Sequence, residues 1–167
     1  MNYLIDCAHS LVSELYTLLR DKNLTVATAE SCTGGLLGAL LTHPAGASRY
    51  YLGGVVSYAN EVKKELLGVK NGTLASVGAV SSETACEMSK GAKKAIGASL
   101  AVSITGIAGP GGESTLKPQG LVYISTYDGK ELIVKEHHFT GDRATVRLKS
   151  AEAALTMLIA AAKAYRN

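Results

Sequence analysis

A serine stands where a short apolar strand, residues 24–29, breaks into a helix expected over residues 32–42. In the first turn of such a helix, backbone N–H groups lack intrahelical partners and carry partial positive charge. Here those groups belong to Cys32, Thr33 and Gly34. Ser31 would thus combine an oxygen nucleophile with a small oxyanion hole. The alternative is that Ser31 or Thr33 only caps the helix.

A nucleophilic serine needs a base, and histidine does not provide an obvious one. The four histidines, none of them in a recognisable triad, are His9, His43, His137 and His138. A Ser-x-x-Lys pair is also missing, since Gly34 follows Ser31 by three places. Lys63 is the candidate base, because a lysine that is desolvated near other cations can be neutral at ordinary pH. It lies in the first turn of a helix that Asn60 is expected to cap.

The segment 105–120, T-G-I-A-G-P-G-G-E-S-T-L-K-P-Q-G, is predicted to be a loop because it is rich in glycine and proline. It fits neither the dinucleotide fingerprint nor the P-loop, whose Lys and Ser/Thr are replaced by Gly112 and Glu113. Successive glycine amides can still form an anion-binding concavity. The glycines concerned are Gly106, Gly109, Gly111 and Gly112. A purely structural loop that turns a hairpin is the alternative.

Hydrophobic periodicity predicts the element order α-β-α-β-α-α-β-β-β-α. The helices are expected at 3–21, 32–42, 61–68, 82–96 and 142–165, and the strands at 24–29, 51–58, 100–104, 120–127 and 131–139, while 71–80 is expected to be a short helical turn and a loop. Ser81 or Ser82 should cap the helix at 82–96, and Asp142 the last one. This order implies an α/β fold with a mixed, mostly parallel sheet covered by helices on both faces.

Three candidate segments each follow a strand: Ser31, Tyr58–Lys63 and Thr105–Lys117. Ligands of such sheets bind beyond the carboxyl ends of the strands. The convergence of the three segments therefore predicts a binding or catalytic domain.

Composition narrows the class of protein further. The 167 residues suit one domain, 1–167, and 47% of them are hydrophobic, with one Phe and no Trp. The core should therefore consist of Ala, Val, Ile and Leu. The formal net charge of +3 is too small and too dispersed to favour nucleic-acid binding.

The three cysteines, Cys7, Cys32 and Cys86, form no C-x-x-C pair, so neither a disulfide framework nor a cysteine zinc site is expected. The N-terminus does not look like a signal peptide, and the most apolar stretch, 151–162, is too short to span a membrane. A soluble cytoplasmic protein that binds no membrane is the expectation.

Five motifs together resemble those of the CinA C-terminal family, the family of nicotinamide-nucleotide amidases (PncC). They are A-E-S-C-T-G-G (29–35), G-G-V-V-S-Y-A-N-E-V-K-K-E-L-L-G-V (53–69), G-A-V-S (78–81), T-G-I-A-G-P-G-G (105–112) and K-P-Q-G-L-V-Y-I (117–124). The resemblance covers about residues 5–165. The N-terminal domain of larger members has no counterpart here, so the chain looks like a stand-alone amidase.

The resemblance implies a three-layer α/β/α sandwich with a five-stranded sheet. It also implies hydrolysis of the carboxamide of nicotinamide mononucleotide to nicotinate mononucleotide and ammonia, with no metal or cofactor. The catalytic residues of the family correspond to Ser31, Lys63 and Thr105. Some members are described mainly by association with competence.

In the mechanism that we expect, Tyr58 or Thr105 relays the proton or orients Lys63. The phosphate of this small-molecule nucleotide is held by the glycine loop together with a basic side chain: Lys117, Arg143 or Arg147. Two alternatives remain: a nucleotide-binding or regulatory module without turnover, and a thiol hydrolase that uses Cys32. The sequence leaves the oligomeric state open, a homo-oligomer included.

Overall fold

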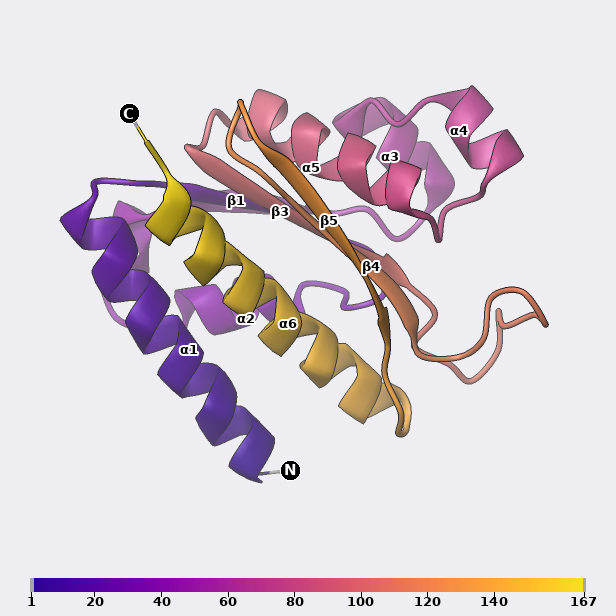
Figure 1. Ribbon diagram of the computed structural model, residues 1–167, viewed down its shortest axis with the longest axis horizontal. Helices are drawn as coiled ribbons and strands as arrows, with labels where there is room; N and C mark the ends of the chain where they lie inside the picture. The colour runs from indigo at the N-terminus through magenta and orange to yellow at the C-terminus, as the bar shows by residue number, and fades with distance from the viewer. Residues whose placement is uncertain (1, 167) are drawn as a thin grey trace.

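The computed structural model describes residues 2–166, with side chains from residue 8 onward. A five-stranded sheet forms the middle layer of the protein (Figure 1). The strand order is β2-β1-β3-β4-β5, with parallel β2-β1 and β1-β3 pairs and antiparallel β3-β4 and β4-β5 pairs. Four strands therefore run in one direction and β4 in the other. The strands are β1 (Val26–Glu30), β2 (Tyr51–Val56), β3 (Leu100–Gly106), β4 (Leu121–Tyr127) and β5 (Leu132–His138).

Helices cover both faces of this sheet, which gives the three layers (Figure 1). One face carries α1 (Asn2–Asp21), α2 (Leu36–Thr42) and α6 (Arg143–Ala164). The other carries α3 (Asn60–Leu67), α4 (Asn71–Ser76) and α5 (Ser82–Ile96). A short 3-10 helix, η1 (Ala47–Arg49), precedes β2. The α/β class, the mixed sheet and the three layers agree with the sequence prediction.

The predicted element order is found apart from two additional short elements, the helix α4 and the 3-10 helix η1, and several boundaries differ. Helix α2 begins at Leu36, not near Cys32, and β2 ends at Val56. Ala59 is the N-cap residue of α3, so the predicted capping role of Asn60 is wrong. The caps at Ser81 and Asp142 are confirmed, since their side chains accept hydrogen bonds from Thr84 N and Thr145 N.

The two cores on either side of the sheet differ in their packing. Leu, Ile and Val dominate the core under α1, α2 and α6. Alanines dominate the core under α3 and α5, where the helices lie close to the sheet. Gly91 of α5 is packed so tightly that a Cβ there would lie 2.0 Å from the carbonyl oxygen of Leu67. This close approach holds α3, and with it Lys63, against the rest of the molecule.

The carboxyl ends of three neighbouring strands meet at one edge of the sheet. Glu30, the last residue of β1, pairs with Val56 of β2 and with Ile104 of β3. The segments that follow these strands therefore start level with one another, as the sequence predicted. The loop between β3 and β4 projects from the body of the molecule on the right of Figure 1.

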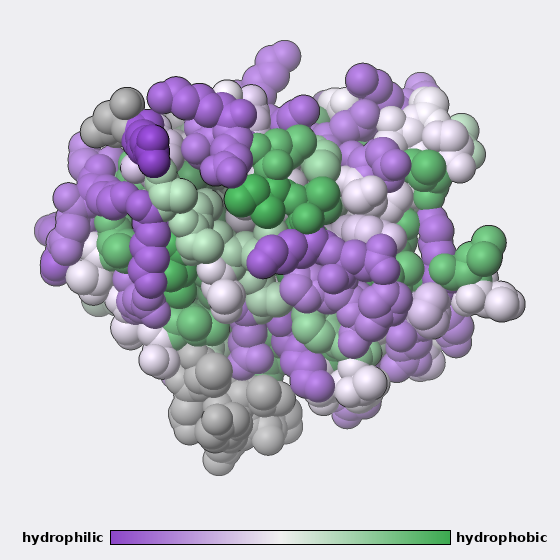
Figure 2. Space-filling model, viewed as in Figure 1, coloured by the Kyte–Doolittle hydropathy of each residue, from purple (hydrophilic) through white to green (hydrophobic). Residues whose placement is uncertain are grey.

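Figure 2 shows the face that carries α1, α6 and β5, where hydrophilic and hydrophobic residues are interspersed. No helix within residues 2–166 combines the length and the hydrophobicity needed to cross a membrane.

Candidate active site

Ser31 begins a tight turn between β1 and α2. Its N–H donates to Ile104 O at 2.9 Å, and its carbonyl accepts from Gly34 N at 3.0 Å. Gly34 and Gly35 have φ values of +60° and +96°, which favour glycine and delay the start of the helix. Gly35 is the N-cap residue of α2 and has no side chain of its own to cap the helix, so the alternative that Ser31 or Thr33 is the cap is wrong.

The three backbone amides predicted as oxyanion donors are not equivalent. Gly34 N is already used by the Ser31 carbonyl, so it is not free to bind a substrate oxygen. Cys32 N and Thr33 N donate to no acceptor within residues 2–166. Two donors are therefore available directly after Ser31. The amides at the start of α2 itself are bound by the carboxylate of Glu30.

Lys63, on α3, reaches Ser31 from the neighbouring segment. Its side chain is 1% exposed, and Nζ lies 3.1 Å from Ser31 Oγ. Nζ also donates to Ser57 O at 2.6 Å and approaches Tyr58 O at 3.4 Å. The structure thus brings the predicted nucleophile and the predicted base within hydrogen-bonding distance.

Burial lowers the pKa of Lys63, and the nearby Cys32 thiol has a smaller, opposite effect. Neighbouring cations, expected from the sequence to assist, are not among the causes of this pKa shift. A neutral amine has two N–H donors and one lone pair. The Ser57 and Tyr58 carbonyls can accept the two N–H bonds, which leaves the lone pair to accept a proton from the Ser31 hydroxyl.

Cys32 adjoins the serine, but its thiol is poorly suited to be a nucleophile. Burial, assisted by the charge of Glu30, raises its pKa to about 11. The thiolate is the reactive form of cysteine, and it is scarce near neutral pH in such an environment.

Tyr58 and Thr105 lie at the site without touching the Lys63–Ser31 pair through their side chains. The Tyr58 ring is 61% exposed, and its hydroxyl accepts from Arg143 Nη2 at 3.2 Å. Only its backbone carbonyl faces Lys63. The buried Thr105 hydroxyl donates to Ala79 O at 2.7 Å. Tyr58 therefore orients the lysine by its main chain, and Thr105 fixes the 79–80 wall of the site.

A cleft of about 270 Å³ opens onto Ser31 and Lys63. Its walls come from the segments after β1, β2 and β3, together with Ala79, Val80 and the first residue of α6. That residue, Arg143, donates from Nη1 to Gly109 O at 2.9 Å and so joins the glycine loop to Tyr58. Besides Lys63, it is the only basic side chain that lines this cleft among the described residues.

The four glycines predicted to bind substrate all line the cleft, but Gly106 has another reason to be glycine. It is the last residue of β3, and a Cβ there would lie 2.6 Å from Leu121 O of β4. Gly109, Gly111 and Gly112 have positive φ values of +70°, +89° and +83°. Their amides have no acceptor within residues 2–166. The loop therefore offers free N–H groups beside Arg143.

The other two basic candidates lie outside the cleft lining. Lys117 Nζ donates to Val77 O at 2.5 Å and lines a separate surface hollow with Tyr123 and Glu83. Arg147 Nη2 donates to Thr33 O at 2.8 Å, so its guanidinium binds the main chain of the turn after Ser31. Of the three residues predicted to bind phosphate, the structure brings only Arg143 to the site.

Sequence reasoning missed several contributors. The Ser57 carbonyl is the shortest contact of Lys63 Nζ, and Asn60 lines the cleft instead of capping α3. Main-chain carbonyls carry no residue signature, so Ser57 could not be found from sequence. Ala79 and Val80 lie in the motif G-A-V-S (78–81), to which the sequence assigns no role. No group of three or more His, Cys, Asp or Glu residues among those described is placed to hold a metal ion.

Comparison with known proteins identifies relatives that match most of this chain. A CinA-like protein of Syntrophomonas wolfei subsp. wolfei is 49% identical over 149 residues, 89% of this chain and 36% of that protein. A CinA-like protein of Thermotoga maritima is 49% identical over 141 residues, 84% of this chain and 34% of that protein. The chain thus spans about a third of the length of these curated relatives.

Solved structures match nearly the whole chain at lower identity. The competence/damage inducible protein CihA from Agrobacterium tumefaciens superposes with a TM-score of 0.91 at 42% identity, covering 92% of this chain and 94% of that one. The competence damage-inducible protein A (ComA) from Klebsiella pneumoniae gives a TM-score of 0.92 at 34% identity, covering 95% and 99%. The model of the CinA C-terminal domain matches residues 8–162. The chain therefore belongs to the CinA C-terminal domain family.

Proposed function

We propose that this protein is an amidase that converts nicotinamide mononucleotide to nicotinate mononucleotide and ammonia. The observation that carries the proposal is the 3.1 Å contact between Ser31 Oγ and the Nζ atom of Lys63, a lysine that is 1% exposed. A serine activated by a desolvated lysine is a nucleophile–base pair for acyl transfer. The choice of substrate rests on the five motifs shared with nicotinamide-nucleotide amidases.

In the first half of the reaction, Ser31 Oγ attacks the carboxamide carbon while Lys63 Nζ takes the hydroxyl proton. The oxyanion of the tetrahedral intermediate accepts from the N–H groups of Cys32 and Thr33, which have no acceptor in the described chain. Loss of one such donor typically costs ~3–4 kcal/mol of transition-state stabilisation. Lys63 then returns the proton to the leaving nitrogen, and ammonia departs.

In the second half, water hydrolyses the acyl-enzyme. Lys63 takes a proton from the attacking water and returns it to Ser31 Oγ as the ester bond breaks. The products are the carboxylic acid and free Ser31, so no redox partner or cofactor is consumed. The Ser57 and Tyr58 carbonyls hold Nζ in place through both halves.

The phosphate of the nucleotide would lie against Arg143 and the free amides of Gly109, Gly111 and Gly112. Arg143 is bound to a tyrosine hydroxyl and a carbonyl and lacks a carboxylate partner among the described ion pairs, so its charge is available to a phosphate. Lys117 and Arg147 instead donate hydrogen bonds to the carbonyls of Val77 and Thr33.

The test of the activity is ammonia release from nicotinamide mononucleotide by the purified protein, with and without a thiol alkylator. We expect turnover that the alkylator does not inhibit. A protein that binds the nucleotide without releasing ammonia would instead be a regulatory module. Inhibition by the alkylator would favour the cysteine mechanism, against which the pKa of about 11 for Cys32 argues.

The test of phosphate recognition compares three substrates and two variants. We expect kcat/KM to fall from the mononucleotide to nicotinamide riboside and further to free nicotinamide, as remote binding energy is lost. Arg143→Ala should lower kcat/KM for the mononucleotide by roughly 10- to 100-fold, since a charged hydrogen bond contributes ~1.5–3 kcal/mol. It should change the value for the riboside little. Lys117→Ala is the matched control and should behave as wild type with both substrates.

A further inference from the structure

Glu30 is a buried carboxylate next to the nucleophile, and the proposed reaction does not use it. It is the last residue of β1, directly precedes Ser31 and is 1% exposed. Its two oxygens accept three backbone hydrogen bonds: Oε2 from Gly35 N at 3.1 Å and Leu37 N at 3.0 Å, and Oε1 from Gly38 N at 2.8 Å. These donors lie on the far side of the turn that contains Ser31.

The side chain of Glu30 therefore ties together the two ends of the turn 31–34. One end is fixed through the Glu30 backbone, which is part of the sheet, and the other through amides of Gly35 and α2. Among the described residues, the turn and its junction with α2 have two backbone bonds, from Gly34 N to Ser31 O and from Leu36 N to Thr33 O. Glu30 thus supplies most of the hydrogen bonds that set the position of α2 relative to β1.

The position of α2 depends on the Glu30 carboxylate, because that carboxylate is buried and has few other partners. None of the ion pairs among residues 8–166 includes Glu30. The three amide hydrogen bonds are therefore what offsets the desolvation of its carboxylate. A buried charge without partners is costly, so Glu30 and the start of α2 must be ordered together. Space is also limited, because a Cβ on Gly38 would lie 2.8 Å from Tyr51 Oη and 3.5 Å from Glu30 Oε1.

We propose that Glu30 is a positioning residue that holds Ser31 in register with Lys63; this rests on the role of Ser31 proposed above. By occupying the amides at the start of α2, Glu30 also leaves Cys32 N and Thr33 N as the free donors beside Ser31. The carboxylate acts through the turn and does not touch the substrate.

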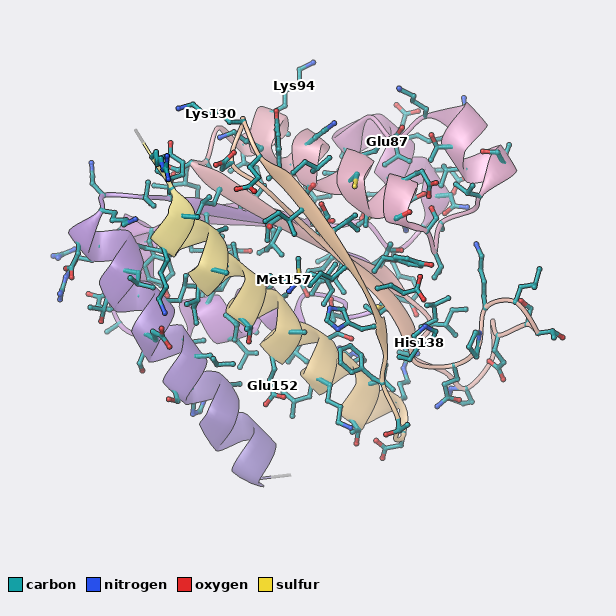
Figure 3. The ribbon with its side chains drawn as sticks, in the orientation of Figure 1. Glu87, Lys94, Lys130, His138, Glu152 and Met157 are labelled. Atoms are coloured by element: carbon teal, nitrogen blue, oxygen red, sulfur yellow. The ribbon has the colours of Figure 1, made fainter. Side chains whose placement is uncertain are left out.

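The test is Glu30→Gln, which keeps the size of the side chain but replaces one acceptor oxygen with a donor. The matched control is Glu87→Gln on α5, labelled in Figure 3. The Glu87 carboxylate accepts from Lys70 N and Thr73 Oγ1, both at 2.9 Å, and its Oε1 lies 3.9 Å from Lys70 Nζ, so it also binds the start of a helix, α4, far from Ser31 in the sequence. Both variants should lose stability, but only Glu30→Gln should disturb the nucleophile.

We expect Glu30→Gln to lower kcat for the mononucleotide by roughly 10- to 100-fold, the effect of misplacing a reacting group by about 1 Å. KM should stay within about threefold of wild type, and Glu87→Gln should leave both constants unchanged. The rate at which a sulfonyl fluoride modifies Ser31, read by intact mass, should fall in parallel with kcat. This second rate does not depend on the identity of the natural substrate, so it tests Glu30 even if the mononucleotide is not hydrolysed. Wild-type kcat and a wild-type sulfonylation rate in Glu30→Gln would overturn the proposal.

Hydrogen exchange of the unaltered protein provides a measurement that needs no variant. The amides of Gly35, Leu37 and Gly38 lie at the start of a helix, where most amides exchange quickly for lack of a partner. Because these three amides donate to Glu30, we expect their exchange to be at least about tenfold slower than that of the Cys32 and Thr33 amides, which have no acceptor among the described residues. Equally fast exchange at all five amides would contradict the binding of the α2 amides by the Glu30 carboxylate, whether or not Glu30→Gln folds.

Discussion

Lys63 and Lys93 are two lysines in very similar settings, and only one of them lies in a candidate active site. Both are on helices, and burial is the main cause that lowers the pKa of each. Both donate to two successive backbone carbonyls: Lys63 to Ser57 and Tyr58, and Lys93 to Ala98 and Ser99, the latter pair at 2.8 Å each.

Lys63 is buried and Lys93 is only half-buried, and three further differences separate the two lysines. Lys93 lies in the last turn of α5, where the helix dipole favours an ammonium, whereas Lys63 lies four residues into α3, nearer the unfavourable end. The charge of Asp128 raises the pKa of Lys93, and no carboxylate does so for Lys63. Lys63 alone has a serine hydroxyl as a third neighbour. Partial burial and a pair of carbonyls therefore do not distinguish Lys63, which we propose as a base, from Lys93; the depth of burial, the helix end and the third neighbour do.

The largest effect should come from removing that third neighbour. Ser31→Ala leaves Lys63 with only two carbonyls, like Lys93, and we expect kcat to fall by roughly 10³-fold or more because the covalent route is lost. Nucleotide binding should persist. The measurement is ammonia release together with calorimetric titration of the mononucleotide. A variant with substantial turnover would mean that Ser31 is not the nucleophile.

The next largest effect should come from exchanging each lysine for arginine. Lys63→Arg should lower kcat by roughly 10²- to 10⁴-fold, because a guanidinium cannot give up its proton at ordinary pH. Lys93→Arg should keep wild-type kcat, since its carbonyl partners only require a donor. Steady-state kinetics of the two variants checks this contrast. Equal activity in both would leave Lys63 with a structural role like that of Lys93.

Sequence patterns could predict the fold because its determinants are local. The apolar runs, the glycines after helices, and the cap residues Ser81 and Asp142 each act over a few neighbouring positions. The predicted start of the helix at Cys32 differs from the observed start at Leu36 for a physical reason. Gly34 and Gly35 were expected within a helix, but they adopt positive φ and extend the turn to Leu36.

The site was predictable only in part. Ser31 and Lys63 follow adjacent parallel strands, so topology alone brings them together. The partners of long basic side chains depend on tertiary packing, and Lys117 and Arg147 are engaged by carbonyls of Val77 and Thr33. Sequence could not reveal that Glu30 binds the start of α2, because a glutamate next to a motif serine is equally compatible with an exposed surface position.

A smaller effect is expected for the cysteine beside the nucleophile. Cys32→Ala should retain kcat within about threefold, since the Cys32 thiol has a pKa of about 11 and stays protonated near neutral pH. Its backbone N–H is unchanged by the substitution. Stability should fall by about 1 kcal/mol, because a small buried side chain leaves a small cavity. Kinetics and urea unfolding of the same preparation measure both quantities, and loss of turnover with intact folding would favour a thiol mechanism.

The smallest effect should appear in the pH dependence of stability. A lysine whose pKa is lower in the folded than in the unfolded protein binds fewer protons when folded, at pH values between the folded pKa and 10.5. The free energy of unfolding should therefore rise with pH through that window, while the cost of the buried ammonium is fully present below the folded pKa. Lys63→Met removes this group, so its unfolding free energy should rise less steeply with pH than that of wild type. Lys93→Met should flatten the curve less, because Lys93 is less buried and Asp128 partly offsets its desolvation. Urea unfolding at pH values from about 7 to 10 measures both slopes. If Lys63→Met keeps the wild-type slope, burial does not depress the pKa of Lys63, and the two lysines differ only in their neighbours.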